Sequence, residues 1–363
     1  MTRWLDLHVR PKVDQPELLL QIESGGLGIF GPSGVGKSRL VDILAGHFTP
    51  SGITLRLDDR VLQSPECPSL PAHQRPLGVV FQDPRLFPHL SVNQNIRLAF
   101  EVTKRVFPQA LFVEIAEQLD ICGLLDRPAR RLSGGEARRV ALTRTLIQQP
   151  RTLILDEPFA GLDPTRKRAL ITLLEDKRTT PGRLILVSHD LNDLIRLCPN
   201  LLLMSAVRAG RSGPTSGLIN ALHPSETALW LGQDSPLNVI DIQGAEIAQD
   251  GLTNLRPKLA PDLILRLPAS DPLTALRVSR LSIAARDISL SLTPLEGVSV
   301  QNQWSVQITQ IAPFSPGQSC LTLSHGALHL KALIASASCD TLSLSTGRWV
   351  TALIKAVALN ASG

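Results

Sequence analysis

One eight-residue segment, Gly31 to Ser38, constrains the fold of this chain more than any other feature. It reads Gly-Pro-Ser-Gly-Val-Gly-Lys-Ser, which fits the pattern of a phosphate-binding loop. The apolar run 27–30 precedes it, and an apolar-periodic stretch over residues 40–44 follows it. This context predicts a buried strand, a glycine-rich turn and a helix in direct succession.

The composition of this loop suits a nucleotide. Glycine allows backbone N–H groups to converge on phosphate oxygens without a Cβ clash, and the helix that follows presents its positive end. Lys37 is expected to reach the β- and γ-phosphates of ATP, and the Ser38 hydroxyl is expected to ligate Mg²⁺. We expect the whole loop to bind the nucleotide: Gly31, Pro32, Ser33, Gly34, Val35, Gly36, Lys37 and Ser38.

Two acidic residues end a second apolar run. Residues 153–155 are Leu-Ile-Leu, and Asp156 and Glu157 follow them. Asp156 can hold Mg²⁺ through water, and Glu157 is placed to accept a proton from the attacking water or to orient it. Two acids after a strand are often only a solvated strand end, but together with the phosphate loop they predict ATP hydrolysis.

A second anion-binding turn is predicted over residues 132–136, which read Leu-Ser-Gly-Gly-Glu. Ser133, Gly134 and Gly135 open an arginine-rich helix and would place backbone N–H groups at its N-terminus. Two such turns in one chain make sense if two copies face each other, each offering this turn to the ATP held by the other. The nearby arginines suit either an anionic partner or ordinary solvated helix ends: Arg127, Arg130, Arg131, Arg138 and Arg139.

These segments resemble the ABC ATPase family. Gln82, Asp163 and His189 complete the family's set of motifs, in its order and rough spacing, over about residues 25–195. The resemblance implies a head-to-tail homodimer that sandwiches two ATP molecules. It also implies that Gln82 contacts Mg²⁺ and water and senses a membrane partner, that Asp163 organises the dimer seam, and that His189 contacts the γ-phosphate.

Two positions depart from the family pattern. Ala160 begins the stretch Ala-Gly-Leu-Asp, where the family often has serine. The family usually has an aromatic residue upstream of the phosphate loop that stacks on adenine, but residues 10–25 contain none. Trp4 is left either to serve as that platform or to be part of the core.

The first part of the chain alternates short apolar runs with helical patterns. Fully apolar strands between helices indicate a sheet covered on both faces, so an α/β fold is expected. The resemblance to the ABC ATPase family implies that this fold is a P-loop NTPase domain of the ABC type with a helical subdomain. The predicted strands are 27–30, 77–81, 152–155 and 184–187, and the predicted helical stretches are 111–125, 136–148 and 165–177.

The pattern changes after a Gly/Ser/Pro-rich break at residues 210–217. From about residue 276, apolar and polar residues alternate, which predicts a small all-β module, and the resemblance described below implies that it is OB-like (Mop). We therefore expect an ABC ATPase domain over residues 1–230, a connecting segment over 231–290 and the β domain over 291–360.

Residues 81–92 resemble the importer branch of the family, which takes up molybdate, sulfate, iron and sugars. In that branch, the segment after the glutamine meets the coupling helix of a permease. Leu86, Phe87 and Leu90 would form this contact here, or they are ordinary core residues.

The C-terminal module resembles the molybdate-binding domain of molybdate importer ATPases, through residues 281–290, 297–304 and 352–356. That family holds oxyanions with a serine, an arginine, backbone amides and a lysine. Ser299 and Lys355 match, but Gln301 replaces the arginine and Ala356 replaces a small hydroxyl residue. A site that lacks a cation and a donor should be weak, so the module either binds an oxyanion weakly or serves only as a dimerisation module.

The resemblance implies the ATP-hydrolysing subunit of an importer that couples hydrolysis to molybdate uptake, with tungstate, sulfate, iron or a sugar as the alternative cargo. The expected partners are a second copy, a two-fold permease and, indirectly, a periplasmic oxyanion-binding protein. The expected location is peripheral, at the cytoplasmic face of the inner membrane.

Composition supports this reading. The chain has no apolar run of about 18 residues, so other chains would form a channel. Five cysteines without a C-x-x-C pair fit a reducing compartment.

Two other classes of protein are disfavoured. ATPases of this family that act on nucleic acid or ribosomes typically carry two fused cassettes or long coiled coils, whereas this chain has one signature and no heptad run. No nucleic-acid partner is therefore expected. A non-catalytic oxyanion sensor would not need an intact set of Lys37, Asp156, Glu157 and His189.

Overall fold

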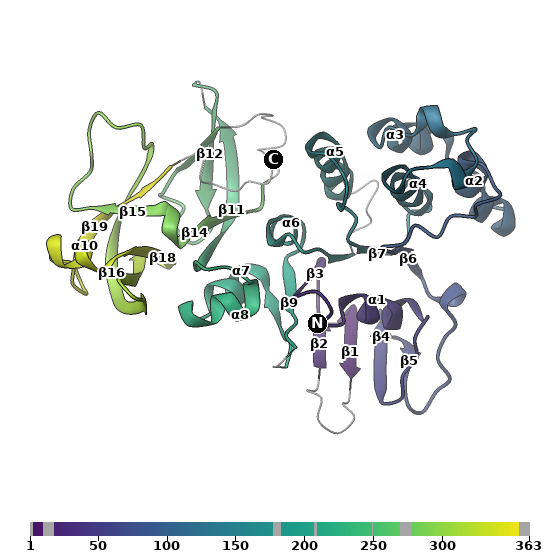
Figure 1. The fold of residues 1–363 in the computed structure, drawn as a ribbon, viewed down its shortest axis with the longest axis horizontal. Coiled ribbons are helices and arrows are strands. Elements are labelled where there is room, and N and C mark those ends of the chain that lie inside the picture. The colour runs from purple at the N-terminus through teal and green to yellow at the C-terminus, as the bar shows by residue number, and fades with distance from the viewer. Residues whose placement is uncertain are drawn as a thin grey trace. The chain divides into compact units, whose positions relative to one another are not determined.

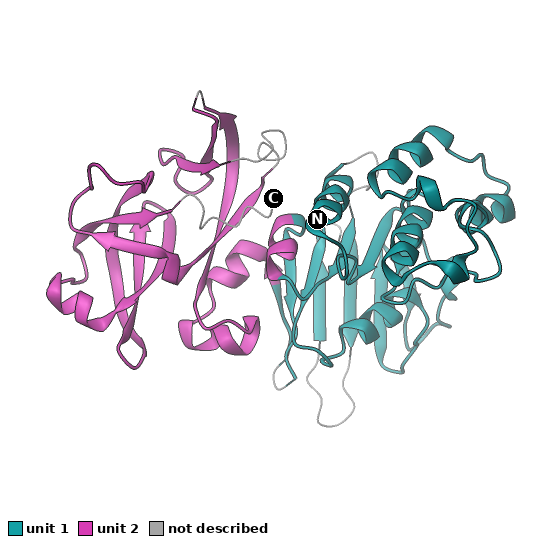
Figure 2. Cartoon of the chain, turned by 45° about the horizontal axis from the view of Figure 1, so that its top comes forward, with its two compact units in different colours: residues 1–190, 197–212 teal, residues 191–196, 213–363 magenta. Residues whose placement is uncertain are grey.

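The computed structural model divides the chain into two compact units, which Figure 2 colours separately. Unit 1 comprises residues 1–190 and 197–212, and unit 2 comprises residues 191–196 and 213–363. The structure describes residues 3–9, 18–176, 183–206, 209–248, 250–268 and 278–355.

A six-stranded sheet forms the centre of unit 1, in the order β10-β9-β3-β8-β7-β6. The five strands from β9 to β6 run parallel. Their central members β3, β7 and β8 are buried at every position, which explains why they are apolar without alternation. The strands are β3 (Leu27–Phe30), β6 (Leu77–Val80), β7 (Thr152–Asp156), β8 (Leu184–Val187), β9 (Asn200–Leu203) and β10 (Arg211–Pro214), so the four predicted strands are confirmed.

A second, antiparallel sheet of unit 1 has the order β2-β1-β4-β5. Helix α1 (Lys37–Ala45) shares one apolar core with both sheets. Trp4 belongs to this core and is only 3% exposed, so it cannot offer a ring face to adenine. The interpretation of Trp4 as a nucleotide platform is therefore wrong. The strands are β1 (Leu5–Val9), β2 (Leu18–Ile22), β4 (Ile53–Leu57) and β5 (Arg60–Gln63).

Figure 1 shows α2, α3 and α4 grouped together as a helical subdomain of unit 1, and α4 packs against β6 of the six-stranded sheet. The predicted helix over residues 111–125 ends earlier, at Gln118, because Asp120 takes a left-handed conformation with φ of 51°. The helices of unit 1 besides α1 are α2 (Val92–Thr103), α3 (Gln109–Gln118), α4 (Gly134–Leu146) and α5 (Pro164–Glu175), whereas residues 191–196 of α6 (Leu191–Leu197) belong to unit 2. Residue 177, the predicted end of the last helical stretch, lies outside the described residues.

Unit 2 contains two antiparallel sheets that share a hydrophobic core. The first has the order β13-β12-β11-β14, and the second has the order β15-β19-β16-β17-β18. The second sheet confirms the predicted all-β module. The elements are α7 (Thr215–Asn220), α8 (Thr227–Leu231), β11 (Leu237–Ile247), β12 (Leu252–Pro257), β13 (Leu265–Pro268), β14 (Arg280–Ala284), β15 (Ile288–Ser291), β16 (Asn302–Ser315), β17 (Gln318–His325), β18 (Leu328–Ala335), α10 (Ser336–Thr341) and β19 (Trp349–Ile354).

The division into units differs from the predicted domain boundaries. The units meet near residue 212, whereas the sequence predicts a boundary at residue 230. Residues 231–290, the predicted connecting segment, supply the strands of the first sheet of unit 2. Across the described ranges, no helix is both long and apolar enough to span a bilayer.

Candidate nucleotide-binding and hydrolysis site

The phosphate loop connects β3 to α1 and depends on glycine at three positions. Gly34 and Gly36 have φ values of 79° and 106°, in the left-handed region that only glycine enters without strain. Gly31 has no room for a side chain, since a Cβ there would lie 2.6 Å from the Met204 carbonyl oxygen. The loop therefore folds back closely enough for α1 to begin at Lys37 with its N-terminus toward the loop.

The Lys37 ammonium group lies against the loop that it belongs to. Its Nζ donates to the carbonyl oxygens of Gly31, at 2.7 Å, and Pro32, at 3.0 Å. A cation fixed over a turn rich in N–H groups is the arrangement expected for binding a polyphosphate.

A pocket of about 460 Å³ lies beside the phosphate loop and contains the three predicted metal ligands. Asp156 ends β7 and is 3% exposed, and its buried Oδ1 atom has no hydrogen-bond partner among the residues that the structure describes. Burial raises the pKa of this carboxyl, and the nearby negative charge of Glu157 raises it further. A hydrogen bond with Ser38 lowers the same pKa and so opposes the shift. The lining residues are Ser38, Asp42, Phe81, Gln82, Asp83, Arg85, Arg138 and Asp156.

This donor set fits Mg²⁺. The ion prefers a few oxygen ligands and retains several waters, and the lining residues Ser38, Gln82 and Asp156 can supply a hydroxyl, an amide oxygen and a carboxylate. The unpaired buried Oδ1 of Asp156 is the group that most needs a cation.

Glu157 and His189 form a pair next to this pocket. Glu157 Oε2 lies 2.7 Å from His189 Nδ1 and also accepts from the His189 backbone N–H at 3.4 Å. Glu157 has a φ of 52°, an uncommon left-handed conformation for a residue with a side chain. Its side chain is 16% exposed and that of His189 is 73% exposed, so the histidine shields the carboxylate on one side.

The predicted second anion-binding turn is the N-terminus of α4. Ser133 caps this helix in a reciprocal arrangement with Glu136: the Ser133 N–H donates to Glu136 Oε2 at 2.8 Å, and the Glu136 N–H donates to Ser133 Oγ at 3.3 Å. The bonds from Ser133 lower the pKa of Glu136. Ser133, Gly134 and Gly135 are not among the residues that line the pocket.

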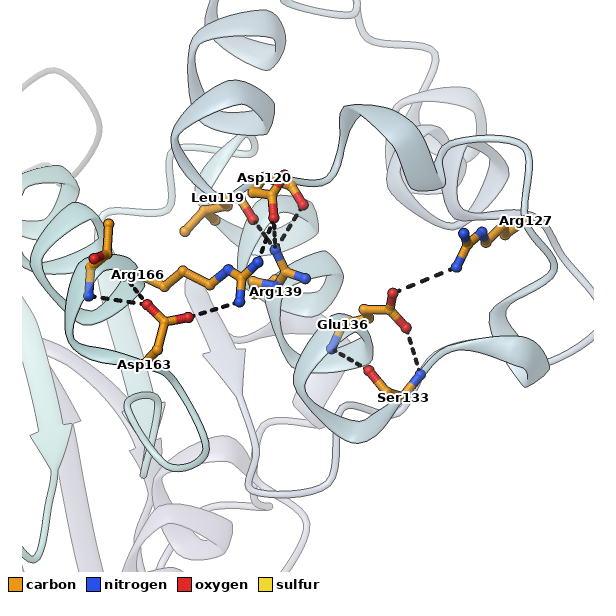
Figure 3. A network of polar contacts seen from close by, with 9 residues as sticks. Leu119, Asp120, Arg127, Ser133, Glu136, Arg139, Asp163 and Arg166 are labelled. Atoms are coloured by element: carbon orange, nitrogen blue, oxygen red, sulfur yellow. Dashed lines mark hydrogen bonds and ion pairs between the residues drawn. The ribbon is translucent and has the colours of Figure 1, made fainter.

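Asp163 caps α5, and Figure 3 shows the network of charges that continues from it. Its Oδ1 accepts from the N–H groups of Thr165 and Arg166 at 3.0 Å, and its Oδ2 accepts from the Arg166 side chain at 2.7 Å. Arg166 also donates to Asp120 Oδ2 at 2.8 Å, and Arg139 donates to the same oxygen at 3.0 Å. Asp163, which is predicted to lie at the dimer seam, thus already has hydrogen-bond partners for both carboxylate oxygens within its own chain.

The three oxyanion candidates lie in unit 2 and are all exposed: Ser299, Gln301 and Lys355. Asn302 pairs with Ile354 in the antiparallel register of β16 and β19. Gln301, just before β16, and Lys355, just after β19, therefore lie at the same end of this strand pair. Ser299 lies two residues before Gln301, in the connection between β15 and β16. Ala356 lies outside the described residues.

One pocket residue, which the sequence predicts either to face an anionic partner or to lie at a solvated helix end, contacts two loops instead. Arg138, on α4, donates to the carbonyl oxygen of Gln82 at 3.2 Å and to that of Ala160. Its place in an arginine-rich helix was visible in the sequence, but these partners lie 56 and 22 residues away along the chain.

Comparisons with known proteins agree with this geometry. The family model for ABC transporters matches residues 18–160, and the model for the TOBE domain matches residues 298–361. The molybdenum import ATP-binding protein ModC of Rhizobium meliloti is 35% identical over 344 residues, which cover 93% of this chain and 94% of that protein. ModC of Thiobacillus denitrificans is 34% identical and covers 97% of both chains.

A solved structure of an ATP-binding cassette in a dimeric, post-hydrolysis state matches 58% of the chain, with 20% identity and a TM-score of 0.49, which is too distant to support an argument. The similarity to the two ModC proteins, over more than nine-tenths of each chain, establishes the family of this chain. This chain belongs to the ModC family of ABC transporter ATP-binding proteins.

Proposed function

We propose that this chain hydrolyses ATP to drive molybdate uptake. The observation that carries the proposal is the convergence of Ser38, Gln82 and Asp156 on one pocket, with the Glu157–His189 pair beside it. The related ModC proteins are named for molybdenum import, which supports molybdate over the other cargoes.

Each residue has a defined task in this proposal. The phosphate loop and Lys37 bind the β- and γ-phosphates, and Ser38, Asp156 and Gln82 would hold Mg²⁺, which neutralises charge on the phosphate oxygens. Glu157 orients the attacking water and accepts its proton, while His189 holds the Glu157 carboxylate in place and contacts the γ-phosphate.

The proposal includes a homodimer. Ser133, Gly134 and Gly135 do not line the pocket of their own chain, so their anion-binding turn would serve the ATP of a second copy. Asp163 would lie at the seam, positioned by its bonds to the start of α5.

The other proposed partners are a two-fold permease and a periplasmic oxyanion-binding protein, which would place the chain at the cytoplasmic face of the inner membrane. Phe87 is the best candidate for contact with the permease, because its ring is 44% exposed. Its backbone is fixed by Asn95, which bonds to the Phe87 N–H at 2.8 Å and to its carbonyl oxygen at 3.1 Å.

The test is ATP hydrolysis by the chain assembled with its permease in vesicles. Binding protein loaded with molybdate should stimulate hydrolysis and uptake, and binding protein loaded with sulfate should not. Tungstate, which has the same shape and charge, forms a third arm that separates an oxyanion-size preference from strict molybdate use. Equal stimulation by sulfate, or none by molybdate, would refute the proposed cargo.

A further inference from the structure

We propose that Arg138 is a positioning residue that ties together two loops of the hydrolysis site. The first is the glutamine loop, residues 82–85, and the second is the aspartate loop, residues 160–163. The inference rests on ATP hydrolysis by this chain and does not depend on which ion is transported.

The guanidinium group of Arg138 spans the two loops directly. Nη2 donates to the Gln82 carbonyl oxygen at 3.2 Å, and Nη1 donates to the Ala160 carbonyl oxygen. Because the guanidinium group is planar and rigid, two carbonyls held by its two ends keep a fixed separation. Lysine, with a single nitrogen on a flexible stem, cannot impose that spacing.

The two loops carry residues of the reaction. Gln82 and Arg138 line the same pocket as Ser38 and Asp156. The Ala160 N–H donates to the Glu157 carbonyl oxygen at 3.3 Å, so the aspartate loop begins in the turn that holds Glu157 in its left-handed conformation. Arg138 therefore connects the backbone of a metal-ligand candidate to the turn that positions the water-activating carboxylate.

The helix that carries Arg138 is firmly anchored. The next residue, Arg139, has a side chain only 8% exposed, and it donates to the carbonyl oxygens of Leu119, at 2.9 Å, and Asp120, at 2.7 Å. Through Asp120 and Arg166, the same helix also reaches Asp163, at the other end of the aspartate loop (Figure 3). Any displacement of α4 would be transmitted to both ends of this loop.

A neighbouring arginine provides a matched control. Arg144 lies on the same helix and donates to the carbonyl oxygens of Pro84, at 3.2 Å, and Arg85, at 3.1 Å. It thus holds the glutamine loop, as Arg138 does, but through carbonyls two and three residues further along. If Arg138 contributed only to packing between the helix and the loop, replacing Arg138 and replacing Arg144 should have the same effect on kcat.

The test compares Arg138→Met, Arg138→Lys and Arg144→Met in the full chain, by steady-state hydrolysis of MgATP and by thermal unfolding. We expect Arg138→Met to lower kcat by about tenfold to a hundredfold, because displacement of reacting groups by about 1 Å costs that much, with KM changed by less than about threefold. Arg144→Met should retain kcat within about threefold. Its melting temperature should be no higher than that of Arg138→Met, so that the difference in kcat cannot be attributed to stability.

Arg138→Lys keeps the charge and most of the packing, so it tests the proposal even if the methionine variant does not fold. It should lose kcat by about threefold to tenfold, since a single nitrogen can bond both carbonyls only at a different separation from the one that the two ends of the guanidinium group impose. Unchanged kcat in Arg138→Lys, or an equal loss of kcat in Arg144→Met, would overturn the proposal. Failure of molybdate transport in vesicles would leave these results unaffected.

Discussion

The phosphate loop of unit 1 and the proposed oxyanion site of unit 2 contain the same two kinds of side chain, a serine and a lysine. In the phosphate loop, Lys37 is held by two carbonyl oxygens, and Ser38 opens α1 beside the buried Asp156. In unit 2, Ser299, Gln301 and Lys355 are exposed, and the resemblance to molybdate importer ATPases leads us to expect an arginine in place of Gln301.

The difference teaches that residue type alone does not make an anion site. Backbone N–H groups and a partly buried cation act in a low-dielectric surrounding, where each interaction is stronger than in water. Exposed side chains must give up solvent and rotational freedom when they bind, so they contribute less. The following predictions test this contrast, from the largest expected effect to the smallest.

Glu157→Gln should reduce kcat by about a hundredfold or more while ATP still binds, because the amide cannot accept the proton of the attacking water. Single-turnover hydrolysis and binding of a fluorescent ATP analogue would measure the two effects separately. Glu246→Gln, which alters an exposed pair with Arg256 in unit 2, is the matched control and should leave both unchanged. Normal turnover in Glu157→Gln would exclude the mechanism.

Gly31→Ala should weaken ATP binding by about tenfold or more and destabilise unit 1 by about 1–3 kcal/mol, because the added Cβ would meet the Met204 carbonyl oxygen at 2.6 Å. Gly213→Ala is the comparison, since a Cβ there meets no atom within 4 Å. Calorimetric titration with ATP and denaturant unfolding would check both variants. Equal behaviour of the two would show that the loop does not need its close approach to Met204.

Gln301→Arg should strengthen molybdate binding by about tenfold, since it restores a charge-assisted hydrogen-bond donor near Lys355. Gln310→Arg adds the same charge at an exposed position of β16, the strand that follows Gln301, and should not change the affinity. Titration calorimetry with molybdate, in nucleotide-free protein, measures both. An equal gain in both variants would mean that overall charge, and not a site, attracts the anion.

The smallest effect concerns the pair of Asp262 and His325 in unit 2, whose side chains lie 2.7 Å apart. The hydrogen bond with Asp262 raises the pKa of His325 above 6.5, and the same bond lowers the pKa of Asp262 below 3.8. The histidine therefore contributes stability below pH 6.5 that is lost as the pH rises through its folded pKa. The carboxylate contributes stability above pH 3.8 that is lost as the pH falls through its folded pKa.

Asp262→Asn should thus lower the melting temperature of the full chain most between pH 3.8 and 6.5, and less at pH 8.5. Differential scanning calorimetry at pH 5.5 and 8.5 would reveal this. In Asp250→Asn, the partner is Arg266 and not a histidine, so the difference between the two pH values should be small. A loss independent of pH in Asp262→Asn would contradict the assignment.

Much of unit 1 could be predicted because its signals are local. The strands β3, β7 and β8 are short runs buried at every position, and the phosphate loop needs its residues in one fixed order. The contacts of Arg138 could not be predicted, because they join segments that only the folded chain brings together. Trp4 was undecidable for the same reason, since its burial depends on strands far along the sequence.

Unit 2 was harder to predict because its patterns change within single elements. Strand β11 is buried at its first four positions and partly exposed over the rest, so neither a period of two nor a continuous apolar run describes it. The later strands, such as β16, begin with regular alternation, and the sequence revealed them.

The capping arrangement at Ser133 determines the polarity of the turn that it opens. Its oxygen already accepts a bond from the Glu136 N–H, so an outside group is offered chiefly the hydroxyl proton and the free N–H groups of the helix. A turn built in this way binds hydrogen-bond acceptors such as anions and offers few ligands to metal ions or ammonium groups. Folding of α4 thereby determines that its N-terminus favours a negatively charged ligand, before any ligand binds.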